Sequence, residues 1–164
     1  MGESGGEWAN GPFYLVFRGA TKVTLDAKGR MVIPTRYRER LVERGDTRLV
    51  VTIDRDQCLL IYPLADWEVI QEKLMRLPTL NEHVRRLQEL LVGHATDVDL
   101  DGHGRLLVPP ALRGFAHLER NAMLIGQGSR FELWDEQRWN ERREQWLKEE
   151  FPTSLPAELA SISL

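Results

Sequence analysis

The five residues Asp26-Ala27-Lys28-Gly29-Arg30 return 75 positions later as Asp101-Gly102-His103-Gly104-Arg105. Both copies have the pattern Asp-x-x-Gly-Arg, and the residues around them also repeat in register. Thr, Val and Leu precede each copy, and a short apolar run that ends in Pro34 or Pro109 follows it. Because such a repeat is one structural unit used twice, the sequence predicts two related halves.

The residues at the start of each copy predict a strand that runs into a tight turn. Val23 and Leu25 are apolar at alternate positions, which is typical of a half-buried strand. Gly29 and Gly104 supply a position where a positive φ is cheap. A second short strand follows each turn.

The aspartates and arginines of the two copies have different expected roles. Asp26 and Asp101 can close the turn by accepting backbone hydrogen bonds. Arg30 and Arg105 lie just past the turn, at the tip of a hairpin. One alternative is that each arginine pairs with the aspartate of its own turn and does nothing more.

Composition indicates a globular protein. The chain has 164 residues, of which 42% are hydrophobic and 29% charged. No apolar run approaches the about 20 residues that a membrane-spanning helix needs, and no signal peptide is visible. With a single cysteine, Cys58, an internal disulfide is excluded and a cytoplasmic location is expected.

Charge is distributed unevenly between the repeats. The net charge of −3 argues against non-specific nucleic-acid binding by the whole surface. Residues 17–44 contain eight basic and three acidic side chains, a balance of +5, whereas residues 96–120 contain three basic and four acidic ones, a balance of −1. If one repeat approaches a polyanion, we expect it to be mainly the first.

Apolar periodicity predicts the remaining elements. Strands are expected at 48–53, 58–62, 122–125 and 131–134, and short helices after Pro34 and Pro109. Apolar residues at helical spacing predict two helices within 64–92, the second capped by Thr79 or Asn81, and a last helix over 136–150. The chain thus divides into a disordered extension (1–16), a first unit (17–63), a helical connector (64–92), a second unit (93–134), a C-terminal helix (135–150) and a tail (151–164).

Motifs for catalysis or cofactor binding are missing. The four histidines fall in different segments, and none has a metal-binding spacing with Cys58 or with another histidine. The run Gly126-Gln127-Gly128 lacks the Gly-Lys-Ser/Thr of a phosphate-binding loop. We therefore expect no enzyme, no cofactor, no metal site and no small-molecule substrate.

Three stretches together resemble the bacterial MraZ family. They are Phe17-Arg18-Gly19-Ala20, the first Asp-x-x-Gly-Arg, and Ile33-Pro34-Thr35-Arg36-Tyr37-Arg38, and the resemblance covers about Phe17 to Trp146. It implies an α+β fold, mainly β, in which two tandem AbrB-type swapped-hairpin units form a pseudo-twofold β-barrel with flanking helices. Because that family begins near Met-Phe-Arg-Gly, we expect the native start at Val16.

The resemblance also implies a function. Family members are sequence-specific DNA-binding transcriptional regulators of the division and cell-wall gene cluster. They regulate their own operon and bind short direct repeats as ring-shaped homo-oligomers. We therefore expect double-stranded DNA and further copies of this chain as partners, and a cytoplasmic, nucleoid-associated location. An AbrB-type protein-interaction module, such as an antitoxin, is the alternative.

The resemblance associates the arginine of the motif with DNA contact, which corresponds to Arg30 and Arg105 here. An arginine at a hairpin tip can donate to O6 and N7 of guanine, the commonest specific contact. Lys28, Arg18 and Arg36 are expected to contact phosphate, which gives affinity without sequence preference. Since Arg30 lies in the more basic repeat, it is the better candidate, and the role of Arg105 is left open.

Overall fold

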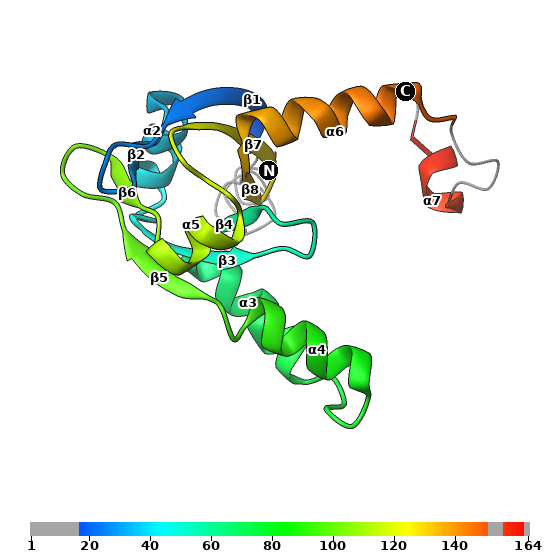
Figure 1. Ribbon diagram of the computed structural model, residues 1–164. Coiled ribbons are helices and arrows are strands. Elements are labelled where there is room, and N and C mark those ends of the chain that lie inside the picture. Colours follow the sequence, from blue (N-terminus) through cyan, green and yellow to red (C-terminus); the bar gives the residue numbers. More distant parts are fainter. Residues whose placement is uncertain (1–16, 151–155, 163–164) are drawn as a thin grey trace, which may run out of the picture.

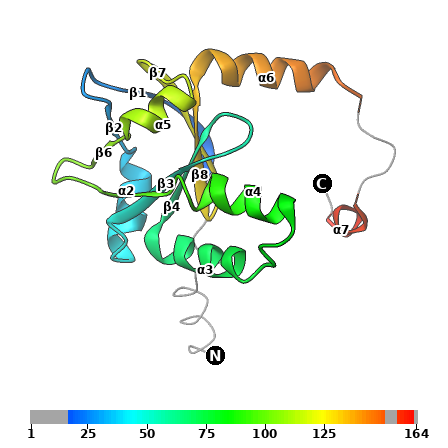
Figure 2. The same cartoon turned by 60° about the horizontal axis from the view of Figure 1, so that its bottom comes forward.

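The computed structural model describes residues 17–150 and 156–162. Figures 1 and 2 show a central β-sheet with helices packed around it and a long C-terminal helix that extends away from the body. The predicted extension 1–16, the expected start at Val16 and much of the predicted tail lie outside the described residues.

The first half contains four strands and one short helix in the predicted order. Pro34 occupies the N-cap position of the helix, and Gly45, at a φ of 75°, follows its last turn. The elements are β1 (Phe17–Thr24), β2 (Arg30–Val32), α2 (Thr35–Glu43), β3 (Arg48–Ile53) and β4 (Leu59–Pro63).

The second half repeats this order, and four further helices complete the described chain. The side chain of Asn81, one of the two predicted caps, accepts hydrogen bonds from the first turn of its helix. The second-half elements are β5 (Thr96–Asp99), β6 (Arg105–Leu107), α5 (Pro110–Phe115), β7 (Asn121–Gly128) and β8 (Arg130–Asp135). The other helices are α3 (Leu64–Met75), α4 (Glu82–Leu91), α6 (Glu136–Lys148) and α7 (Ala157–Ala160).

The two halves interlock through their strands. β1 of the first half pairs with β7 of the second, and β5 of the second half pairs with β3 of the first, all antiparallel. The six-stranded sheet therefore has the order β1-β7-β8-β4-β3-β5, while β2 and β6 form a separate two-stranded sheet. Exchanging the halves leaves both sheets unchanged, so the molecule has pseudo-twofold symmetry.

This pairing corrects the simple hairpin expected around each Asp-x-x-Gly-Arg. Within the described residues, the two strands that flank each turn belong to different sheets and do not pair with each other. Each turn carries the chain from the large sheet to the β2–β6 ribbon. The mixed helix-and-sheet class and the interlocked halves agree with the expectation, whereas no strand pairing in the described part of the chain closes the two sheets into a barrel.

Two apolar clusters lie on opposite faces of the six-stranded sheet. On β3, Leu49, Val51 and Ile53 face a cluster that also contains Met31 and Leu106 from the ribbon. The intervening Val50 faces the second cluster. The second cluster also contains Cys58, Tyr62, Trp67 and Trp134, with parts of α3, α4 and α6 packed against it. Burial raises the pKa of the Cys58 thiol. Met31 and Leu106 in the first cluster anchor the ribbon on one face of the sheet by apolar packing.

Candidate nucleic-acid interface

The β2–β6 ribbon has one buried and one exposed face. Met31 and Leu106, opposite each other, are 1% and 0% exposed. Because successive side chains on a strand point to opposite faces, the flanking residues point outward. Arg30 lies opposite Leu107, and Arg105 opposite Val32. The outward face thus combines two arginines with two apolar side chains that are about half exposed, Val32 at 50% and Leu107 at 49%.

In the first turn the carboxylate of Asp26 organises the backbone and the arginine together. Its Oδ1 accepts hydrogen bonds from the amides of Lys28 and Arg30, both at 2.9 Å. Its Oδ2 accepts from Nε of Arg30 at 2.7 Å. The backbone bond from Arg30 is the main reason why the pKa of Asp26 is lowered.

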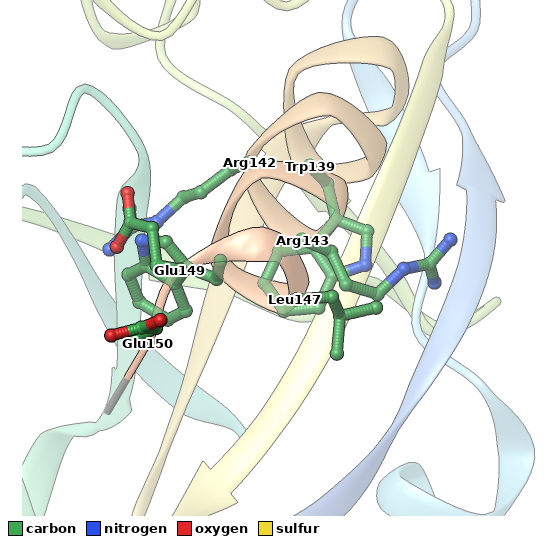
Figure 3. A pocket seen from close by; sticks show the side chains of 7 residues that line it. Trp139, Arg142, Arg143, Leu147, Glu149 and Glu150 are labelled. Carbon is green, nitrogen blue, oxygen red and sulfur yellow. The ribbon is translucent and has the colours of Figure 1, made fainter.

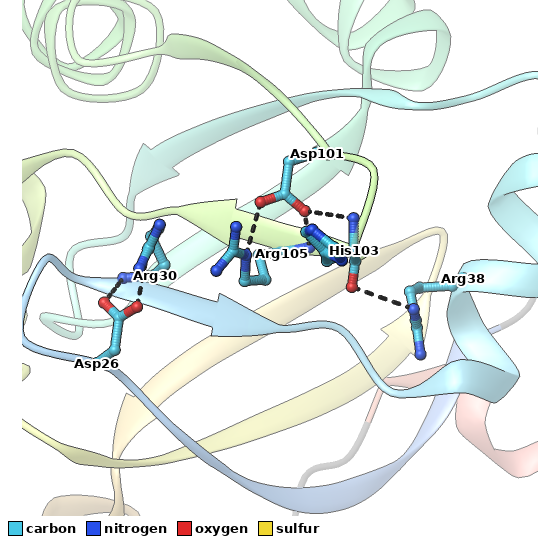
Figure 4. Close-up of polar contacts among 6 residues, drawn as sticks. All are labelled: Asp26, Arg30, Arg38, Asp101, His103 and Arg105. Atoms are coloured by element: carbon cyan, nitrogen blue, oxygen red, sulfur yellow. Dashed lines mark hydrogen bonds and ion pairs between the residues drawn. The ribbon is translucent and has the colours of Figure 1, made fainter.

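The second turn has the same geometry. Asp101 Oδ1 accepts from the amides of His103 and Arg105 at 2.9 and 2.8 Å, and its Oδ2 accepts from Nε of Arg105 at 2.7 Å (Figure 4). These bonds, led by the Arg105 amide, hold the pKa of Asp101 at about 2. Gly104 has a φ of 73° and Gly29 a φ of 84°, as expected for glycines that allow a tight turn.

The ion pair that the alternative predicted, between each arginine and the aspartate of its own turn, is therefore present in both turns. The contact uses only Nε, since among the described residues the terminal nitrogens of Arg30 and Arg105 make no hydrogen bond. A guanidinium has five N–H donors, four of them on the terminal nitrogens. The aspartate thus fixes the direction of each arginine and leaves the donors that a base or phosphate would use.

Each turn is also held by the opposite half of the molecule. The carbonyl of Gly29 accepts a hydrogen bond from the amide of Val108, and the carbonyl of Gly104 accepts one from Ile33, both at 3.0 Å. The guanidinium of Arg113, from α5, lies against Gly29. The side chain of Arg38, from α2, lies in the same way against Gly104.

This exchange is not visible when charges are counted along the sequence. Counting charges along each repeat assigns Arg38 to the first repeat and Arg113 to the second, yet each lies at the turn of the other. Both turns therefore have their own arginine and one from the opposite half. Within the turns, Ala27 corresponds to Gly102, and the difference in charged side chains is Lys28 in the first turn against His103 in the second.

Of the three predicted phosphate contacts, the structure places Lys28 beside the ribbon and separates Arg18 and Arg36 from it. Lys28 is exposed in the first turn. Arg36 donates to Thr21 and to the hydroxyl of Tyr37, and its guanidinium lies over the Tyr37 ring. Arg18 lies near the far end of β1, about 20 Å along the strand from the turn at about 3.3 Å per residue. Arg18 and Arg36 are thus not brought together with Arg30 and Arg105.

Sequence reasoning missed Arg38 and Arg113 as neighbours of the turns. A signal was available, because both follow the proline after their own turn by four residues and are 75 positions apart. The internal repeat thus marks them as equivalent, but only the crossed packing shows which turn each one contacts.

A hollow on α6 lies away from the ribbon. Trp139, Arg142, Arg143 and Leu147 line it with Trp146, Glu149 and Glu150 (Figure 3). In Figures 1 and 2, α6 extends on the side of the body opposite to β2 and β6.

Over the residues that the structure describes, no three His, Cys, Asp or Glu side chains are grouped as a metal ion would require. No helix in the same ranges is long and apolar enough to cross a membrane.

Comparison with known proteins supports the division of the chain into two repeated units. Residues 16–90 and 91–158 each match the family model described as "MraZ protein, putative antitoxin-like". The proteins named "Transcriptional regulator MraZ" from Thioalkalivibrio sulfidiphilus and Alkalilimnicola ehrlichii are 55% and 51% identical over 150 residues, and the one from Pseudomonas aeruginosa is 52% identical over 151. Each alignment covers 91% of this chain and 100% of the relative. The chain therefore belongs to the MraZ family.

Proposed function

We propose that this protein is a transcriptional regulator that binds double-stranded DNA in a sequence-specific way through the exposed face of the β2–β6 ribbon. The observation that carries the proposal is the pair of arginines, Arg30 and Arg105, each directed by its own aspartate, with terminal nitrogens that make no hydrogen bond in the described part of the chain. The names of the relatives, transcriptional regulators of 51–55% identity, support the same role.

The ribbon has the form that a major groove accepts. B-DNA admits a two-stranded β-ribbon into the major groove, where arginine donates to O6 and N7 of guanine. Arg30 and Arg105 come from the two strands of one ribbon and are related by the pseudo-twofold symmetry. They would read bases, and Val32 and Leu107 would supply apolar contact to thymine methyl groups.

Lys28 would contact a phosphate, because it is exposed in the turn that precedes Arg30. Arg18 and Arg36, at a distance from the ribbon, would add phosphate contacts where the DNA path continues along β1. Asp26, Gly29, Asp101 and Gly104 form the turns and do not contact bases in this scheme.

We further propose that a ring of identical subunits binds short direct repeats upstream of the division and cell-wall gene cluster, including its own operon, in the cytoplasm at the nucleoid. One ribbon with few positive charges on a chain of net charge −3 binds weakly by itself. Several ribbons presented to repeated sites gain affinity through effective concentration. Within each subunit, the large sheet and the ribbon would enclose the apolar cluster as a pseudo-twofold barrel.

Selection of DNA from a random pool by the purified full chain, read beside its mass in solution, tests this proposal. We expect enrichment of short G-containing repeats at regular spacing, bound by an oligomer. Recovery of no sequence above background would contradict sequence-specific binding. Enrichment of a single unrepeated site by a monomer would contradict the ring.

A protein-interaction role of the antitoxin type is the second candidate. Its specific support is the exposed apolar face of α6, where Trp146 is 59% and Leu147 75% exposed. Failure of the DNA selection, together with co-purification of a small partner protein lost in Trp146→Ala, would favour this role.

A further inference from the structure

Arg38 and Arg113 make a crossed pair of contacts that neither the turn motif nor the proposed base contacts require. Arg113 from the second half lies so close to Gly29 that a Cβ there would overlap its guanidinium. Arg38 from the first half overlaps a Cβ at Gly104 in the same way. Gly29 and Gly104 are buried, although the residues on the turn side of each are exposed.

Arg38 and Arg113 each have a buried side-chain nitrogen without a hydrogen-bond partner among the described residues. In both arginines this nitrogen is Nε. A buried donor without a partner is disfavoured, and each case in a folded protein needs a reason. The same atom is affected at two positions related by the pseudo-twofold symmetry, so the feature belongs to the architecture.

We propose that Arg38 and Arg113 are positioning residues for DNA binding. Each holds the Asp-x-x-Gly-Arg turn of the opposite half, so that Arg30 and Arg105 are presented at a fixed separation and orientation. The inference rests on the proposed DNA-binding function, which it extends by two residues that act through the turns.

The contacts that Arg38 and Arg113 make with the turns differ in hydrogen bonding. Arg38 donates from Nη1 to the carbonyl of His103 at 3.3 Å and from Nη2 to the hydroxyl of Thr35 at 2.9 Å. The position equivalent to Thr35 in the second half is Pro110, which offers no hydroxyl. The side chain of Arg113 makes no hydrogen bond within the described residues. Arg38 therefore holds the turn at Asp101 by packing and one hydrogen bond, whereas Arg113 contacts the turn at Asp26 by packing alone.

The test uses the full chain with Arg38→Lys and Arg113→Lys, which keep the charge and lose the planar guanidinium. The matched control is Arg85→Lys on α4, whose arginine side chain is 71% exposed and, over the described ranges, pairs only with Glu89. Affinity is measured for the selected site and for random DNA across a range of salt concentrations. Amide hydrogen exchange is measured without DNA.

We expect each Lys variant to bind the selected site about three- to thirty-fold more weakly, with unchanged binding to random DNA and an unchanged salt slope. Exchange should accelerate in the turn of the opposite half, at Gly29 in Arg113→Lys and at Gly104 in Arg38→Lys. Since the exchange experiment contains no DNA, it separates failure of the positioning role from failure of the DNA-binding function. Unchanged exchange in both turns would overturn the inference.

A phosphate-contacting role gives a different result and would also overturn the inference. In that case the Lys variants keep full affinity, while Arg113→Met loses affinity on both DNAs and lowers the salt slope by about one.

Gly29→Ala provides an independent variant, with Gly45→Ala as its control. Both glycines have a positive φ, 84° and 75°, but a Cβ at Gly45 meets nothing within 4 Å. Gly29→Ala should lose at least as much thermal stability as Gly45→Ala, and only Gly29→Ala should lose affinity for the selected site. Equal affinity in the two variants would contradict a role for the Arg113 contact.

Discussion

The turn at Asp26 and the turn at Asp101 share their hydrogen bonds but differ in the side chains around them. Corresponding bonds agree to within 0.1 Å, at 2.9, 2.9 and 2.7 Å in the first turn and 2.9, 2.8 and 2.7 Å in the second. Lys28 corresponds to His103, and Arg38, which donates to the His103 carbonyl, lies against the second turn where Arg113 lies against the first. The motif therefore determines the direction of the arginine, while the charge of each turn and its contacts with the opposite half depend on other residues.

The largest expected effect concerns the buried face of the β2–β6 ribbon. Met31→Ala and Leu106→Ala should each lower the free energy of unfolding by about 2–5 kcal/mol, because both side chains are almost fully buried at equivalent positions. Urea denaturation measures this. Val32→Ala and Leu107→Ala, on the exposed face, are the controls and should change stability by less than about 0.5 kcal/mol. A large loss for only one buried residue would break the equivalence of the two strands.

The next effect concerns the charge that distinguishes the turns. Lys28→Ala should weaken binding to specific and random DNA to a similar degree and reduce the salt slope by about one, because one phosphate contact is lost. His103→Lys makes the second turn resemble the first and should raise the slope by about one. Fluorescence anisotropy at several salt concentrations measures both. A loss confined to the specific site would instead identify Lys28 as a base-reading residue.

The smallest effect is the response of the turns to acid. Since the folded-state pKa of Asp101 is about 2, below the ordinary value of about 3.9, its carboxylate stabilises the turn fully above pH 4. That contribution is lost as the pH falls through about 2. Asp26, whose pKa is also lowered, should follow the same direction. A carboxyl NMR titration reports the midpoints, with Asp101→Asn as the control, and an Asp101 midpoint near 4 would show that the turn is not closed in solution.

Much of the local structure could be predicted from the sequence. The 75-residue repeat located both turns, and the apolar periodicity located the strands at 48–53 and 131–134 and the helices that follow Pro34 and Pro109. These predictions succeeded because they depend on neighbouring residues: glycine at a positive φ, aspartate in a turn, and alternation along a strand.

The contacts between the two halves could not be predicted from local sequence patterns. Alternation at Val23 predicts a strand but does not choose β7 as its partner, and the swapped arrangement came from a family resemblance. Counting charges along the sequence likewise does not show that the added arginine at each turn comes from the opposite half. The burial of an unpaired Nε on Arg38 and Arg113 also depends on long-range packing that no local pattern records.

The most direct test of DNA reading by the ribbon is the affinity of Arg30→Ala, Arg105→Ala and the double variant for the selected site and for a scrambled duplex. Because the two arginines have the same geometry, each single change should cost about 1–3 kcal/mol on the selected site, roughly five- to 150-fold in affinity. Binding of the double variant to both duplexes should become equal, with an unchanged circular dichroism spectrum. Unchanged affinity of the double variant for the selected site would contradict DNA reading by the β2–β6 ribbon.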